Sequence, residues 1–121
     1  MLRRKHPQPI ESIDMLRTKG LKRFAEVFTA DGERIGAVLR FIHRPIEEVN
    51  DEMKLYRSYL ETQSIQFAGP VYIPTVYIED YDPAANRVIL AVDLNTVRNE
   101  AWNREPDFAA RGLGVAEELP H

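Results

Sequence analysis

Apolar and polar residues alternate through most of the middle of the chain, which is the pattern of β-strands. The alternation begins at residues 24–28, resumes at 34–43, returns at 71–79 and ends at 87–92. Both faces of the last stretch are apolar, so we expect this strand to be central in a sheet or covered by another element. The pattern therefore predicts a mainly β domain.

Glycine and proline mark where these strands turn or bend. Asp31 and Gly32 predict a tight hairpin, because an Asp-Gly pair tolerates the positive φ angles of such a turn. Gly36 lies inside the next strand, where a missing side chain indicates a bulge, a bend or a close backbone approach. Pro74 cannot donate to a ladder, so it must lie at an edge, a bend or a strand boundary. A further turn is expected at residues 82–86.

Two segments with helical spacing flank the strands. Ile10, Ile13 and Leu16 lie where one helical face can bury them, and a glycine at position 20 would end that helix. Eight residues form a helix only when they pack against something else, so an extended segment is the alternative. After the last strand, Asp93 or Asn95 can cap a short helix that runs to about residue 102 and stops before the proline at 106.

Residues 45–63 fit two periods at once. Apolar residues recur at helical spacing from Ile46 to Leu60, whereas residues 56–62 are aromatic and rich in β-formers. We divide the segment into a short helix from Pro45 to about residue 52 and a strand from about 54 to 62. The strands are expected to share one core that contains Val27, Ile35, Val38, Ile73, Val88 and Leu90.

The order of these features is similar to that of the PRC-barrel family. Residues 27–38, Val-Phe-Thr-Ala-Asp-Gly-Glu-Arg-Ile-Gly-Ala-Val, resemble its opening hairpin, and residues 72–92 resemble its closing strands, with a helix ending near Trp102 after them. The resemblance covers about residues 21–106. It implies a small, strongly bent antiparallel sheet that closes into a β-barrel with one or two short helices. It also implies a role in protein association, with no shared catalytic residues; residues 43–56 are longer than the family's usual turn.

Charge divides the chain unevenly. Residues 1–23 hold seven Lys or Arg against two acidic residues, a charge of +5, which leaves −8 for the rest of a chain whose formal charge is −3. We therefore expect a basic N-terminal arm at 1–20, the PRC-barrel-like domain at 21–106 and a C-terminal tail at 107–121. The tail has scattered apolar residues and either is disordered or docks on a partner chain. No apolar run is long enough to span a bilayer, and a cytoplasmic protein is expected.

Candidate chemistry is sparse, and we expect no catalytic, cofactor-binding or metal-binding residue. The chain has no cysteine, and its histidines, His6, His43 and His121, lack metal-ligand spacing. The acidic cluster at 79–82 lacks the pattern of a calcium loop, and Gly112-Leu113-Gly114 lacks a third glycine. No serine has an evident basic partner: the serines are Ser12, Ser58 and Ser64.

These observations favour a non-enzymatic protein-interaction or scaffolding module that self-associates, most simply as a homodimer, or that docks on an unidentified protein partner. The alternative is an adaptor for RNA or ribosomes that uses the basic arm. Five tyrosines offer a stacking platform for single-stranded nucleic acid, with Arg57 and Arg87 nearby, but the charge of −8 does not favour this use. The tyrosines are Tyr56, Tyr59, Tyr72, Tyr77 and Tyr81.

Overall fold

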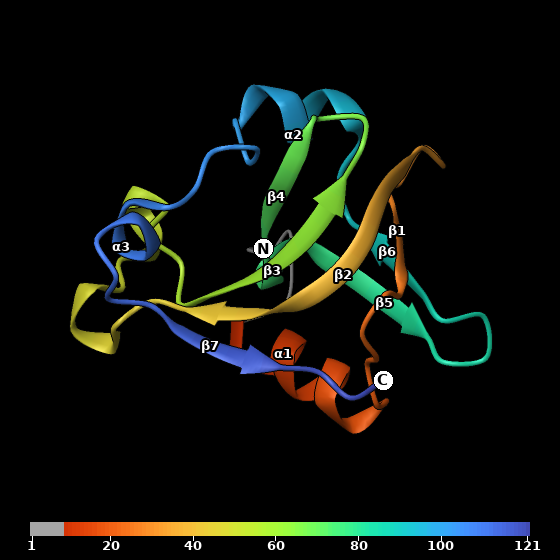
Figure 1. Ribbon diagram of the computed structural model, residues 1–121, viewed down its shortest axis with the longest axis horizontal. Helices are drawn as coiled ribbons and strands as arrows, with labels where there is room; N and C mark the ends of the chain where they lie inside the picture. The colour runs from red at the N-terminus through yellow and green to blue at the C-terminus, as the bar shows by residue number, and fades with distance from the viewer. Residues whose placement is uncertain (1–8) are drawn as a thin grey trace, which may run out of the picture.

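The computed structural model describes residues 9–121, and it confirms a mainly β fold with a few short helices (Figure 1). The strands are β1 (Glu26–Phe28), β2 (Arg34–His43), β3 (Ser58–Ser64), β4 (Gly69–Pro74), β5 (Ile78–Asp82), β6 (Arg87–Leu90) and β7 (Val115–Glu118). The helices are α1 (Pro9–Thr18), α2 (Leu94–Asn99) and α3 (Asp107–Ala110), with 3-10 turns η1 (Ile46–Glu48), η2 (Asp51–Met53) and η3 (Thr75–Tyr77).

All seven strands belong to one bent sheet, in the order β4-β3-β2-β1-β6-β5, with β7 paired to β2 as well. The ends of this order, β4 and β5, are not paired with each other, so the strand ladder stays open. β1 and β6 run parallel, which differs from the expected all-antiparallel sheet. A parallel pair needs a long crossover connection, and here strands β2 to β5 lie between the two along the chain.

The first hairpin forms at the expected position but with a different turn. Gly32 takes a positive φ of 87°, whereas Asp31 does not. The Thr29 backbone amide donates to the carbonyl of Glu33 at 2.9 Å, and the Glu33 amide donates to the Thr29 hydroxyl at 2.9 Å. The loop is therefore longer than a two-residue turn. The Thr29 hydroxyl accepts from the Glu33 amide, which would bond to a backbone carbonyl in a tighter hairpin.

Gly36 is confirmed as a place of close backbone approach. A Cβ atom built there would lie 1.8 Å from the carbonyl oxygen of Gln63, on the neighbouring strand β3. The register of β1 against β2 also shifts between Val27, which pairs with Gly36, and Phe28, which pairs with Arg34. Two of the three features expected at this glycine, a bulge and a close approach, therefore occur together.

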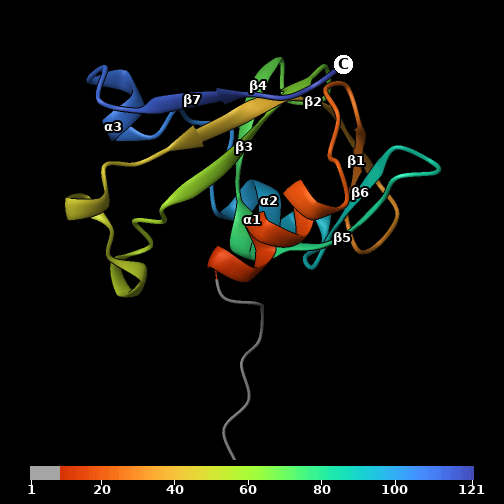
Figure 2. The ribbon, with the colours of Figure 1, turned by 90° about the horizontal axis from the view of Figure 1, so that it is seen from below.

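The predicted core is confirmed. Every member of the expected set is buried in one cluster, which α1 covers on one side through Ile13 and Leu16 (Figure 2). β6 lies between β1 and β5, as its two apolar faces predicted. Ile10 is placed in α1, but its side chain lies outside the described part of the chain. Gly20 follows the helix with a φ of 75°, as expected for a helix end.

The helix predicted at 45–52 is wrong. The segment instead forms the two 3-10 turns η1 and η2, and a bridge between Asn50 and Leu55 closes the loop around η2. Ile46 and Met53 are exposed, so the helical stripe had no surface against which to pack. The strand of this segment is confirmed, although it begins at Ser58 and not at about residue 54. At α2, Asp93 is the N-cap, since its carboxylate accepts from the Thr96 amide at 2.9 Å.

The C-terminal segment folds back onto the sheet. β7 pairs antiparallel with the end of β2, from Arg40 opposite Glu118 to His43 opposite Val115. Phe108 of α3 is fully buried beside Tyr59, with ring centroids 5.8 Å apart. Tail residues thus contribute a strand and a core aromatic to the same body as the predicted domain.

Candidate functional site

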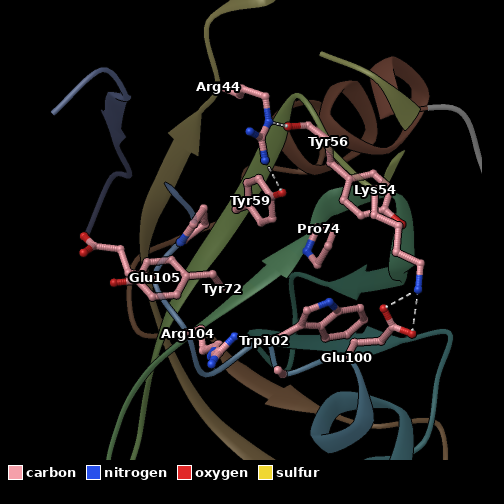
Figure 3. A pocket seen from close by; sticks show the side chains of 12 residues that line it. Arg44, Lys54, Tyr56, Tyr59, Tyr72, Pro74, Glu100, Trp102, Arg104 and Glu105 are labelled. Atoms are coloured by element: carbon pink, nitrogen blue, oxygen red, sulfur yellow. Dashed lines mark hydrogen bonds and ion pairs between the residues drawn. The ribbon is translucent and has the colours of Figure 1, made fainter. Parts of the chain in front are cut away.

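A cleft of about 200 Å³ opens between β3, β4 and the segment that follows α2 (Figure 3). Tyr59 pairs with Pro74 across β3 and β4, which places both on one wall. The opposite wall is held by a hydrogen bond from the Tyr72 amide to the carbonyl of Trp102, at 2.7 Å. The lining residues are Arg44, Lys54, Tyr56, Tyr59, Tyr72, Pro74, Glu100, Ala101, Trp102, Arg104, Glu105 and Pro106.

Aromatic side chains form the floor of the cleft. Tyr56 packs edge-on against Tyr77, with hydroxyl oxygens 3.0 Å apart, and the Tyr77 ring lies 5.1 Å from that of Trp102. Burial is the main cause that raises the pKa of both Tyr56 and Tyr72. The two phenols are therefore neutral at physiological pH and can donate a hydrogen bond. Such a floor suits an apolar or planar ligand with a few polar groups.

Arg44 is the most unusual residue of this cleft. The residue is buried, with only 4% of its surface exposed to solvent. Its Nε donates to the Tyr56 carbonyl at 2.7 Å, and its Nη2 donates to the Tyr59 hydroxyl at 2.8 Å. The guanidinium carbon lies 4.5 Å from the centroid of the Phe108 ring. Among the side chains of residues 13–121 no carboxylate forms an ion pair with Arg44, so within that range its charge is buried against neutral partners.

The rim carries both signs of charge. Lys54 bonds both carboxylate oxygens of Glu100, at 3.0 and 3.2 Å, and this hydrogen bond is the main cause that raises the pKa of Lys54. Arg104 and Glu105 are exposed on the other side and form no ion pair within the described chain. Because the Lys54 charge is already balanced by Glu100, Arg44 and Arg104 are the cations left to act on a ligand, and of these two only Arg44 is buried.

A second polar group of interest lies where β2, β3 and β7 meet. His43 Nδ1 is 2.8 Å from Ser58 Oγ, and its Nε2 is 2.8 Å from a Glu117 oxygen. A carboxylate only accepts hydrogen bonds, so His43 carries a proton on Nε2. Arg17 also bonds Glu117, at 2.5 and 3.1 Å. The hydrogen bond from Arg17 is the main cause that lowers the pKa of Glu117, and the bond to His43 adds to it.

The expectation that no serine has a basic partner is therefore wrong for Ser58. Cross-strand pairing places it opposite His43, which the separation of 15 residues along the chain hid. These groups line a cavity of about 240 Å³ with Arg17 and Arg57. Ser58 is only 3% exposed, however, and a nucleophile must reach its substrate. We assign the group to fastening β7, which carries Glu117, to the rest of the sheet.

The five tyrosines that were candidates for a stacking platform lie in different parts of the structure. Tyr56, Tyr59 and Tyr72 line the cleft, but Tyr81 is fully buried in the main core, where its hydroxyl donates to Asn86 at 2.6 Å. The five tyrosines thus form no single stacking surface. In the acidic cluster at 79–82, Asp80 pairs with Lys19 at 2.5 Å.

The segment after β2 and the segment before β7 lie at the same end of the molecule, next to α3 (Figures 1 and 2), and their exposed apolar residues form an apolar strip. We use this name for Ile46, Leu113 and Val115, which are 71%, 45% and 62% exposed. β7 begins opposite the end of β2, so the residues just after β2 and just before β7 run side by side. An ion pair of 2.9 Å between Arg111 and Glu48 holds the two segments together further out.

Neither a membrane-spanning helix nor a metal-binding cluster is found in the part of the chain that the structure describes. No helix within residues 9–121 is long and apolar enough to cross a membrane. Among the side chains of residues 13–121, no three of His, Asp or Glu lie close enough together to hold a metal ion. No family model, no curated protein and no solved structure matches the chain.

Proposed function

We propose that this chain is a non-enzymatic protein-interaction module of the cytoplasm that self-associates as a two-fold dimer. The apolar strip carries the proposal, because large apolar side chains gathered at one exposed end mark association sites more often than isolated ones do. The order of hairpin, bulge and closing strands that resembles a PRC-barrel supports the same role, since protein association is what that resemblance implies.

The sheet edges favour β7 as the strand that meets a second copy. The β4 edge contains Pro70 and Pro74, which cannot donate, and its Tyr72 amide is already bonded to Trp102. The β5 edge is acidic and exposed at Glu79, and like charges on two copies would repel. These two edges therefore resist pairing with another sheet.

The β7 edge lacks such protection. Its acidic residues are neutralised within the chain, since Glu117 pairs with Arg17 and Glu118 pairs with Arg40 at 2.9 Å. Within the described chain β7 pairs only with β2, so its outer backbone groups are open to a further strand. Antiparallel pairing of two β7 strands would place both apolar strips inside a closed two-fold interface.

Light scattering coupled to size exclusion tests this proposal. At micromolar concentration we expect the mass of two chains, and because the contact is apolar the dimer should persist in high salt. The double variant Leu113→Lys and Val115→Lys should elute as one chain. The matched control is Ile65→Lys, which replaces an exposed apolar residue in the turn between β3 and β4. A monomeric mass for the unaltered protein contradicts self-association, and a double variant that stays dimeric contradicts the surface.

The adaptor for RNA or ribosomes is the alternative proposal. Its basic residues are partly engaged, because Arg17 pairs with Glu117 and Lys19 pairs with Asp80. The remaining Lys and Arg residues of the arm lie among residues 1–8, outside the described chain. Fluorescence anisotropy with a labelled single-stranded RNA separates the two functions: binding that weakens steeply with salt supports the adaptor.

A further inference from the structure

We propose that the aromatic cleft is a binding site for a carboxylate carried on an aromatic or apolar body, with Arg44 as the residue that recognises the acid group. The proposal goes beyond self-association, because the cleft and the apolar strip share no residue. It rests on the burial and partners of Arg44, on the chemistry of the cleft floor and on the charges at the rim.

The buried guanidinium needs an anion. A charge taken out of water is destabilising unless an opposite charge or several hydrogen bonds replace its hydration. Arg44 has hydrogen bonds to a carbonyl and a phenol, and both acceptors are neutral. Its Nη1 makes no hydrogen bond to any residue that the structure describes, and Arg44 lines the cleft. The missing counter-ion can therefore be supplied by a ligand that enters there.

The pattern of free donors selects a carboxylate. Tyr56 accepts from the Nε–H and Tyr59 from one Nη2–H, so three N–H groups stay open, two on Nη1 and one on Nη2. A carboxylate needs few donors and matches the planar guanidinium, whereas a phosphate dianion needs more positive charge. Of the other cations that line the cleft, Lys54 is held by Glu100, and Arg104 is followed by Glu105, whose carboxylate adds negative charge to the rim. These carboxylates disfavour a dianion.

The floor selects the body of the ligand. Tyr72 and Trp102 are both buried and line the cleft, and Pro74 lines it as well (Figure 3). Rings packed on such a surface gain from stacking and from apolar burial. The carboxylate can belong to a free small acid or to the C-terminus of a polypeptide that ends in an aromatic residue, and the two sources share this chemistry.

Trp102 gives a direct measurement, because it is the only tryptophan of the chain. We would titrate the full-length protein with benzoate, benzamide, inorganic phosphate, N-acetylphenylalanine and its amide, and follow tryptophan fluorescence. Thermal midpoints would be measured in parallel, because a ligand that binds the folded state raises the midpoint. We expect saturable binding of benzoate, and binding of benzamide at least about tenfold weaker, as expected when a charged hydrogen bond is lost.

The variant Arg44→Met should weaken benzoate binding by about tenfold or more while leaving benzamide unchanged. Its matched control is Arg87→Met, because Arg87 also lies 4.5 Å over a phenylalanine ring, that of Phe28, but outside the cleft. If Arg44→Met does not fold, the contrast between benzoate and benzamide on the unaltered protein decides. Tighter binding of N-acetylphenylalanine than of benzoate assigns the polypeptide source, and the reverse assigns the free acid.

Three results would overturn the proposal. Equal affinity for benzoate and benzamide would mean that the charge of Arg44 does not contribute to ligand binding. Phosphate binding as tightly as benzoate would mean that the aromatic floor adds nothing. No response of fluorescence or thermal midpoint to any of the five probes would mean that the cleft holds no such ligand.

Discussion

Replacing Gly36 by alanine tests the close approach of β2 to the backbone of β3. The new Cβ would lie 1.8 Å from the Gln63 carbonyl oxygen, 2.8 Å from the Gln63 carbonyl carbon and 3.1 Å from the Ser64 Cα. All three are backbone atoms of β3, so no side chain can rotate away and the two strands must separate. Overpacking typically costs 1–3 kcal/mol, and a contact this short on backbone places Gly36→Ala at about 3 kcal/mol or more.

Urea unfolding followed by circular dichroism measures this change. A thermal melt gives a second measurement. A domain of this size loses about 4 °C of thermal midpoint per kcal/mol, so the midpoint of Gly36→Ala should fall by about 10 °C or more. Gly32→Ala is the control, because it has a positive φ of 87° but nothing within 4 Å of the added methyl group. Its strain should cost about 1 kcal/mol. A loss below about 1 kcal/mol for Gly36→Ala, or equal losses for both variants, would refute the close approach of β2 and β3.

Three further outcomes are expected. Leu90→Ala should lower the free energy of unfolding by about 2–5 kcal/mol in denaturant melts, since Leu90 is buried in the core, and a change below about 0.5 kcal/mol would place it on the surface. Deletion of residues 1–8, which lie outside the described chain, should leave the thermal midpoint nearly unchanged, whereas aggregation or early melting would make them integral to the fold. Because Arg17 and His43 hold the pKa of Glu117 below 4.5, its folded carboxylate stabilises the protein above that pH and the benefit is lost on further acidification. Stability measured against pH should therefore fall less between neutral and acid pH in Glu117→Gln, and equal losses would contradict the pairing.

Local pattern was enough to predict most of the strands and the core. Alternation placed Val88 and Leu90 on one face, and turn chemistry placed the first hairpin, because both signals act over a few neighbouring residues. Helical spacing at 45–52 misled for a physical reason. Spacing describes a face, but a helix also needs a surface to cover, and Ile46 points into solvent. The parallel pairing of β1 with β6 joins residues about sixty apart, and no local signal encodes it.

The C-terminal strand was missed because its residues do not look like a strand. Three of the four residues of β7 are exposed, and two are glutamates. It forms because the end of β2 offers an unpaired edge and because Arg17 and Arg40 neutralise those glutamates. The two arginines that neutralise these glutamates lie far from β7 along the chain. The sequence of the tail alone therefore favoured disorder or docking on a partner chain.

The candidate sites illustrate the same limit at neighbouring positions. His43 and Arg44 are consecutive, and consecutive residues at a strand end point to opposite faces. His43 therefore meets Ser58 and Glu117 beneath β7, while Arg44 meets Tyr59 and the aromatic cleft. In the sequence, His43 and Arg44 look like two ordinary polar residues at the start of a turn. Their chemistry arises only when strand pairing brings distant residues to them, because Glu117 fixes a proton on Nε2 of His43 and no described carboxylate pairs with the buried Arg44.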